Sequence, residues 1–142
     1  MRIGIIGCTS HKQEYRCSTR EMYSKSTNFR NQLKYLEKIC NCDKIYVLSA
    51  KHRVLDLVTK IEPYNTKLKG TKEDNKWHEE VIAKLDKLTD FKNDEFIIVC
   101  GKNYYRKLIT HLNNKNIPAN LSQGLKKRFF VKELEKAGIE VS

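Results

Sequence analysis

Three short runs of apolar, mostly β-branched residues constrain the fold of this 142-residue chain more than any other feature of its sequence. They are RIGIIG at residues 2–7, KIYVLSA at 44–50 and EFIIVCG at 95–101, and each has the length of a strand. Continuous apolar runs of this kind are typical of strands that are buried on both faces of a parallel sheet. The chain is therefore predicted to contain a parallel sheet covered by helices.

Amphipathic helices are predicted between these runs, because apolar residues there recur at helical spacing. We expect one helix that begins between residues 19 and 27 and ends at Asn41, a second over residues 71–90 and a third after residue 101. Residues 51–70 are expected to form a loop with a short helical turn, residues 117–121 a last short strand and residues 124–136 a terminal helix. This order predicts one domain over residues 1–142, a small three-layer, Rossmann-like α/β domain with a mainly parallel sheet of about four strands.

The charge balance is strongly positive. The chain has 28 Lys and Arg residues against 17 Asp and Glu residues, a formal net charge of +11. A charge of this size favours a polyanionic partner such as a nucleic acid. The apolar runs are far shorter than the roughly 20 residues that span a bilayer, and the first residues lack a signal-peptide pattern. We therefore expect a cytoplasmic protein with no membrane partner, whose oligomeric state the sequence does not define.

The cysteines do not form an obvious framework. There are five of them, an odd number, and at least two lie in runs predicted to be buried strands, so disulfides are not expected. Cys40 and Cys42 have a single residue between them, whereas structural zinc ligands usually have about two to four. We expect neither a metal site nor a cofactor.

Ligands of parallel α/β sheets bind outside the carboxyl ends of the strands, so the loops after the predicted strands are candidate sites. The first of these loops, GCTSHK, brings together Cys8, Thr9, Ser10, His11 and Lys12, a dense set of donors and nucleophiles. A neighbouring Lys12 or His11 would activate Cys8 by stabilising its thiolate. The alternative is that Cys8 is a small apolar residue that ends a buried strand.

The second and third loops, LSAKHR and GKNYYRK, place Ser49, Lys51 and Gly101 beside several cations. Lysine and arginine donors at a strand end suit phosphate oxygens, although a solvated basic loop would have the same composition. The GxxxxGK[ST] phosphate loop is absent from the chain, which disfavours a nucleoside triphosphatase.

Three segments together resemble a known family. They are GCTSHK at residues 7–12, MYSKSTNFRNQLKY at 22–35 and YVLSAKHRVLDLVTKIEPYNTKL at 46–68. They resemble a bacterial and phage domain family of unknown function with the ordered patterns CSxxK, LYxSxxFRxxxxY and ILSAKxGLLxPxxxIxPYxxxL. The third segment also resembles the longer peroxide-stress YaaA family. The likeness spans roughly the first half of the chain.

The resemblance implies contact with nucleic acid. YaaA relatives are associated with DNA binding, and a YaaA-like branch is linked to conversion of a base nitrile to an amide when 7-deazaguanine bases are placed in DNA. A related pattern resembles the nitrile-handling part of archaeosine synthase, which acts on tRNA. A modified purine in DNA or tRNA, or a nucleotide-like small molecule, is the substrate that these likenesses imply.

Carried onto this chain, the resemblance implies a catalytic set of Cys8, Lys12, Tyr23 and Tyr64. A Cys8 thiolate would add to an electrophilic carbon, and the tyrosines would supply hydroxyl donors. The matching positions that would hold substrate oxygens are Ser26, Arg30, Ser49 and Lys51. The chain departs from the pattern at Thr9, Arg53 and Leu57, where the family has Ser, Gly and Pro, so its pocket is expected to differ.

Three hypotheses follow. The first is an enzyme that acts on a nucleobase or nucleotide, with Cys8 and Lys12 at its centre. The second is a noncatalytic, basic nucleic-acid-binding protein of the YaaA type, in which Cys8 contributes nothing to affinity. The third is that the basic surface is incidental, because runs of charge are usually solvated faces.

Overall fold

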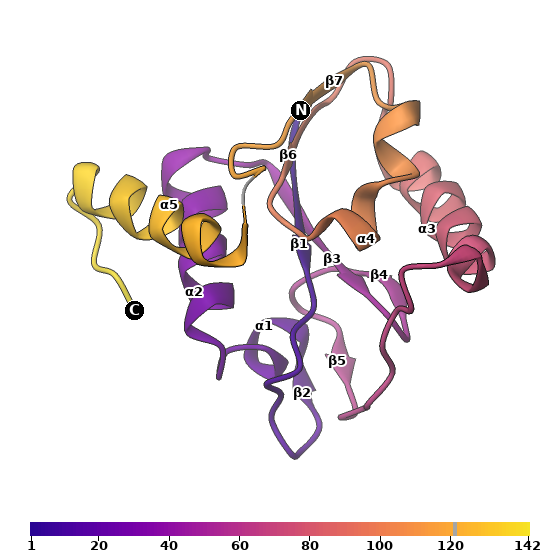
Figure 1. Ribbon diagram of the computed structural model, residues 1–142, viewed down its shortest axis with the longest axis horizontal. Helices are drawn as coiled ribbons and strands as arrows, with labels where there is room; N and C mark the ends of the chain where they lie inside the picture. The colour runs from indigo at the N-terminus through magenta and orange to yellow at the C-terminus, as the bar shows by residue number, and fades with distance from the viewer. Residues whose placement is uncertain (121) are drawn as a thin grey trace.

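A central sheet organises the computed structural model, which describes residues 1–120 and 122–142. Within these residues the sheet has five strands, in the order β4-β3-β1-β6-β7 (Figure 1). Strands β1 (Arg2–Gly7), β3 (Lys44–Ser49), β6 (Glu95–Ile98) and β7 (Asn114–Asn116) run parallel to one another, and β4 (Arg53–Leu55) runs antiparallel to β3 at one edge. The predicted α/β fold with a mainly parallel sheet is confirmed.

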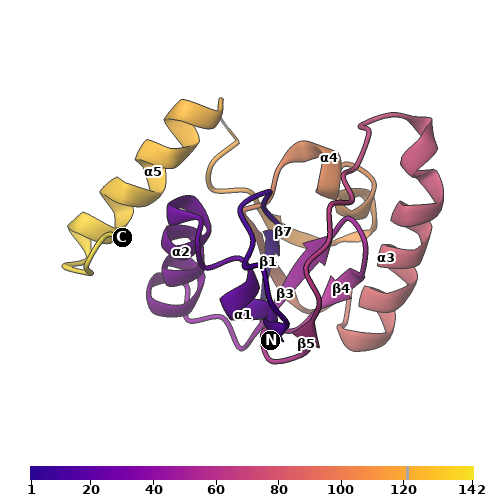
Figure 2. The same cartoon turned by 90° about the horizontal axis from the view of Figure 1, so that it is seen from below.

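Helices cover both faces of this sheet (Figure 2). One face is covered by α1 (Thr19–Met22), α2 (Thr27–Lys34), the π-helical turn η1 (Tyr35–Ile39) and α5 (Gln123–Lys136). The other face is covered by α3 (Asn75–Leu88), α4 (Lys102–Tyr105) and the 3-10 turn η3 (Leu108–His111). A second 3-10 turn, η2 (Lys72–Asp74), leads into α3. The result is the three-layer arrangement that the sequence predicts.

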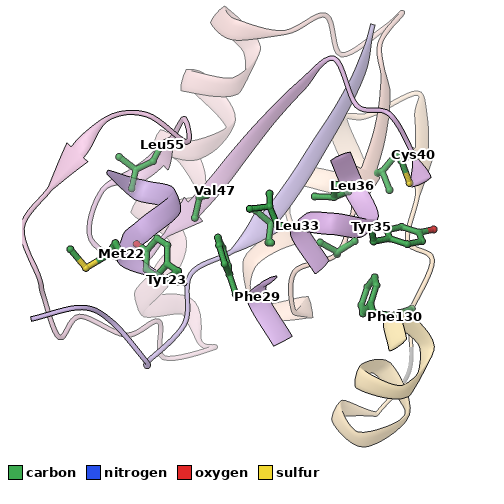
Figure 3. Close-up of a cluster of buried hydrophobic side chains, with 14 of the residues drawn as sticks. Met22, Tyr23, Phe29, Leu33, Tyr35, Leu36, Cys40, Val47, Leu55 and Phe130 are labelled. Carbon is green, nitrogen blue, oxygen red and sulfur yellow. The ribbon is translucent and has the colours of Figure 1, made fainter. Parts of the chain in front are cut away.

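Strand β1 divides the hydrophobic core into two clusters, because its side chains alternate between the faces. Ile6 belongs to the cluster beneath α2 and α5, whereas Ile3 and Ile5 belong to the cluster beneath α3. Figure 3 shows the first cluster, in which Tyr23 and Phe29 lie side by side. All of these side chains are at most 1% exposed.

The order of the strands defines where a ligand is expected. The chain passes from β1 to β3 through α2 on one face, and later from β4 to β6 through α3 on the other face. Strand β6 pairs with β1 on the side opposite to β3. The direction of strand order therefore reverses between β1 and β6, and ligands of open α/β sheets bind at the carboxyl ends of such a pair. Cys8 follows β1 directly at this point.

Some local predictions are wrong, and the short elements explain most of them. Residues 51–70 contain β4 and the two-residue strand β5 (Lys60–Ile61), which pairs with β2 (Cys17–Ser18), instead of a helical turn. The helix expected before Asn41 begins at Thr27, inside the predicted range, where the Ser26 hydroxyl accepts a hydrogen bond from the N–H of Phe29; the short helix α1 precedes it as a separate element. Strands of two or three residues are too short for an alternating pattern to reveal.

The last strand also lies earlier than predicted. It is β7 at Asn114–Asn116, and residues 117–120 are not a strand, while Leu121, the end of the predicted segment, lies outside the described residues. All three residues of β7 are exposed and polar, so no apolar run marks them. No helix in the described part of the chain is both long and apolar enough to cross a membrane.

Candidate active site

Cys8 stands at the carboxyl end of β1 and faces a cleft. Its N–H donates a hydrogen bond to the carbonyl of Leu48 at 3.0 Å, which continues the pairing of β1 with β3 by one residue. The half-buried thiol packs against the core cluster on one side. On the other side its Sγ lies 3.3 Å from the hydroxyl of Tyr104, which follows β6. The Cys8 thiol is therefore held at the point where the strand order reverses.

We call the open space beside this thiol the Cys8 cleft. Its volume is about 260 Å³, and its lining combines two cations with hydroxyl and amide groups and contains no carboxylate. The lining residues are Cys8, Thr9, Ser10, Lys12, Thr66, Lys67, Leu68, Asn103 and Tyr104. Such a lining favours an electron-rich or anionic ligand.

Lys12 connects the cleft to a second group of polar side chains. Its Nζ lies 4.6 Å from the centre of the Tyr64 ring, within the range of a cation–π interaction. Burial lowers the pKa of Lys12, and the nearby Cys8 acts in the opposite direction. A lysine whose pKa is lowered is better able to exchange a proton with a substrate near neutral pH.

Three hydroxyl groups form a hydrogen-bonded chain next to Lys12. The Tyr64 hydroxyl lies 2.5 Å from that of Tyr23 and 2.8 Å from Oγ of Ser49. Burial raises the pKa of Tyr23 to about 12, although its hydrogen bond with Tyr64 lowers it. Burial also raises the pKa of Tyr64, and Cys8 contributes to the shift. Both tyrosines therefore stay neutral at ordinary pH and are able to donate hydrogen bonds.

Neighbouring elements hold the hydroxyl chain in place. The indole N–H of Trp77, in α3, donates to the Ser49 carbonyl at 2.9 Å, and the N–H of His52 donates to Ser49 Oγ at 3.0 Å. The His52 ring lies edge-on to the Tyr64 ring at 5.4 Å. Its Nε2 is buried and has no partner in the part of the chain described, and burial, followed by Lys51, lowers its pKa. His52 is therefore predicted to be neutral at physiological pH.

Tyr104 is a site residue that the sequence did not single out. Its ring packs edge-on against Trp77 with centroids 5.7 Å apart, and its hydroxyl contacts Cys8. Burial raises its pKa, and Cys8 adds to the effect. The tyrosine pair after the third strand was noticeable in the motif GKNYYRK, but the motif does not indicate which ring is core: Tyr105 is buried, whereas Tyr104 reaches the cleft.

The structure brings the four predicted catalytic residues together. Cys8 and Lys12 line the cleft, Lys12 lies over Tyr64, and Tyr64 is bonded to Tyr23. Two predicted substrate-binding residues, Thr9 and Ser10, also line the cleft, and Ser49 belongs to the hydroxyl chain. The roles of these residues stay predictions.

The other predicted binding residues lie elsewhere. His11 and Ser26 line a separate surface cleft of about 420 Å³, and Ser26 also caps α2. Arg30 donates to the Ser24 carbonyl and to Thr27 Oγ1, so it holds the turn before α2.

Lys51 and Gly101 also lie apart from the Cys8 cleft. Lys51 is exposed, and its carbonyl accepts a hydrogen bond from Arg53 at 2.6 Å. Gly101 lines a third cleft, together with Cys100 and Lys126. Three further residues of the Cys8 cleft were not singled out in the sequence, namely Thr66, Lys67 and Asn103, whereas Leu68 matches the last leucine of the PYxxxL pattern.

Comparison with known proteins identifies the family. Residues 3–130 match the model of a family described as "Family of unknown function (DUF6884)". The chain belongs to this family. The segment that matches the DUF6884 model includes all the residues of the Cys8 cleft and of the hydroxyl chain. No curated protein and no solved structure matches this DUF6884 chain.

Proposed function

We propose that this protein is an enzyme that modifies a nucleobase or nucleotide, with Cys8 as its nucleophile. The observation that supports it best is the position of the Cys8 thiol. The thiol faces an open cleft at the carboxyl ends of β1 and β6, where the strand order reverses. Its Sγ lies 3.3 Å from the Tyr104 hydroxyl, and Lys12 lines the same cleft. A cysteine with only a structural role would have no need of a cation and a proton donor in the same cleft.

The arrangement supports addition of a thiol to an electrophilic carbon, such as that of a nitrile. The Cys8 Sγ would form a bond to the carbon, and the displaced electron pair would move to the attached nitrogen. That nitrogen would take a proton from Lys12 or Tyr104. The proton that the Cys8 thiol loses would then reprotonate the residue that donated. The Tyr23, Tyr64 and Ser49 hydroxyls would fix the position of Lys12 through the Tyr64 ring.

Charge and resemblance support a substrate from nucleic-acid chemistry. The chain has a net charge of +11, and the Cys8 cleft contains Lys12 and Lys67 and no carboxylate. The likeness to YaaA proteins adds a modified purine, of the 7-deazaguanine type, in DNA or tRNA. All five cysteines are free thiols, so we place the enzyme in a reducing compartment such as the cytoplasm.

Alkylation of the native protein tests the role of Cys8. Iodoacetamide at neutral pH should label Cys8 faster than any other cysteine, as measured by mass spectrometry of the peptides. Cys42 is the matched control, because it is also half-buried but burial raises its pKa to about 12. Equal labelling of Cys8 and Cys42 would contradict a reactive Cys8.

The reaction itself needs a substrate probe. Incubation with a 7-deazaguanine nucleotide that bears a nitrile should add the mass of the nucleotide to the wild-type protein and not to Cys8→Ala. Lys12→Met should slow adduct formation without preventing folding, because Lys12 is only half-buried. Absence of an adduct together with unselective alkylation would remove the enzyme proposal.

The second candidate function is noncatalytic binding of nucleic acid, favoured by the surface cleft where Lys25 and Lys127 accompany His11. Under this hypothesis Cys8→Ala binds oligonucleotides as tightly as the wild type. Affinity for DNA or RNA should fall steeply with added salt, because cations that neutralise phosphates release counterions. An affinity for DNA or RNA that does not change with salt concentration would exclude a nucleic acid as the partner.

A further inference from the structure

The cleft lined by Gly101, Cys100 and Lys126 also lies at the carboxyl end of the sheet, and we call it the Lys126 cleft. Its volume is about 120 Å³, and it is lined by Cys100, Gly101, Lys102, Tyr105, Ile117, Ala119, Asn120 and Lys126. The segment that follows β6 lines both clefts, since Asn103 and Tyr104 face the Cys8 cleft and Gly101 and Lys102 face this one. The two clefts are therefore neighbours.

Lys126 is the unusual residue of this cleft. It is only 8% exposed, because it lies on the buried face of α5, four residues before Phe130 and eight before Leu134, which are both fully buried. Among the residues that the structure describes, its ammonium group makes no hydrogen bond or ion pair. Keeping a charged lysine side chain mostly buried, with no carboxylate beside it in the cleft, is costly, so its position calls for an explanation.

Among the described residues that line the cleft, no group neutralises this charge. Cys100 is the nearby ionisable residue, and burial raises its pKa to about 12, so it remains a neutral thiol. Burial lowers the pKa of Lys126, which is the expected response of an unpaired cation. The lining contains a second cation, Lys102, and the amide of Asn120, but no carboxylate. The charge is thus complementary to an anion.

We infer that the Lys126 cleft binds a single phosphate group. Its volume is well below the roughly 300 to 1,000 Å³ of pockets that enclose a drug-sized molecule, so it suits a group of a few atoms. Lys126 and Lys102 would bind the phosphate oxygens, and Asn120 would donate a further hydrogen bond. A buried lysine then has a function that packing alone does not require.

The location connects this site to the proposed function, on which the next step rests. The ends of β1 and β6 are in close contact, since a Cβ placed on Gly7 would lie 3.1 Å from Cβ of Cys100. A nucleotide that placed its base in the Cys8 cleft would extend its sugar past the segment after β6. Its phosphate would then enter the Lys126 cleft, and the nucleotide would be held at both ends.

Inorganic phosphate is the probe that tests the site itself. Phosphate should raise the thermal unfolding midpoint of the full-length wild type and of Lys132→Met, an exposed lysine on the same helix. Lys126→Met should lose this response, because loss of a charge-assisted hydrogen bond weakens affinity by about tenfold or more. Sodium chloride at matched ionic strength measures the nonspecific effect of salt. A phosphate response in Lys126→Met equal to that of the wild type would overturn the inference.

A second measurement does not depend on any variant folding. In the wild type, phosphate should shift the backbone amide resonances of Gly101, Lys102 and Asn120 in a saturable way. Shifts confined to other parts of the chain, or no saturation, would overturn the site. Cys8→Ala should bind phosphate as the wild type does, so a failure of the catalytic proposal is separable from a failure of this one. A mononucleotide that binds Lys126→Met and the wild type equally would refute the connection between the two clefts.

Discussion

Tyr64 is the central member of the hydroxyl chain. Its replacement by phenylalanine is predicted to lower the free energy of unfolding by more than the same replacement of Tyr23. In Tyr64→Phe the ring stays in place and still accepts the cation–π contact of Lys12. Tyr23, which is 0% exposed, loses the hydroxyl that lies 2.5 Å from its own. A buried hydroxyl without a partner costs about 1–3 kcal/mol. Ser49 Oγ, by contrast, keeps the hydrogen bond that it accepts from His52.

Tyr23→Phe is the matched variant. It removes the buried hydroxyl at one end of the chain, and Tyr64 keeps its hydrogen bond with Ser49 at 2.8 Å. Only the net value of one hydrogen bond is lost, about 1 kcal/mol. In the double variant no hydroxyl is left without a partner, so its cost should be smaller than the sum of the two single costs by about 0.5 kcal/mol or more.

Urea unfolding at equilibrium measures all three variants, and the fluorescence of Trp77, the only tryptophan of the chain, reports the transition. The free energy of unfolding should be highest for the wild type, lower for Tyr23→Phe and lowest of the three for Tyr64→Phe, with equal denaturant slopes. If the two single variants cost the same, or if their costs add in the double variant, the hydroxyls do not form a coupled chain and the site is organised differently.

Two other predictions concern the support of the site. Trp77→Phe removes the N–H that donates to the buried Ser49 carbonyl, so the free energy of unfolding, followed by circular dichroism, should fall by about 1–3 kcal/mol; an unchanged value would show that this bond does not hold β3. Asp74 is buried, and burial alone would raise its pKa, but the N–H groups of Lys69 and Gly70 donate to its carboxylate at 3.1 and 2.7 Å and the net pKa is lowered. Because the carboxyl group binds protons less readily in the folded state, its contribution is present above the ordinary pKa of about 4 and is lost as the pH falls through the lowered one. Asp74→Asn should therefore lose less stability on acidification than the wild type, and equal losses would show that other carboxylates dominate.

The predictability of each strand follows from its environment. The runs at residues 2–7, 44–50 and 95–101 are buried on both faces, so their apolar, β-branched composition is a requirement of the fold and is visible in the sequence. Strands β4, β5 and β7 have three residues or fewer, and β7 is entirely exposed. Pairing of the backbone, which any residue provides, creates these short strands, so no pattern of side chains announces them.

In the candidate site, too, some residues are indicated by the sequence and others are placed only by the tertiary structure. Cys8 and Lys12 are near each other in the chain and follow a predicted strand, so residue types and topology alone indicated them, whereas Tyr23 and Tyr64 were indicated by resemblance. Tyr104 lies 96 residues from Cys8, and their contact exists only because β6 pairs with β1. Periodicity on α5 predicted an apolar stripe, but not that Lys126 would lie on its buried face.

By itself, the sequence determined a parallel α/β sheet, a basic chain and a loop rich in donors and nucleophilic residue types at the end of its first strand, because these depend on composition and on neighbours along the chain. Only the tertiary structure decided which distant groups share a cleft. The order of the strands placed Tyr104 beside Cys8, and the packing of α5 buried Lys126 next to Cys100. Such contacts depend on how elements pack across the chain, and packing is a property of the whole fold that no local pattern encodes.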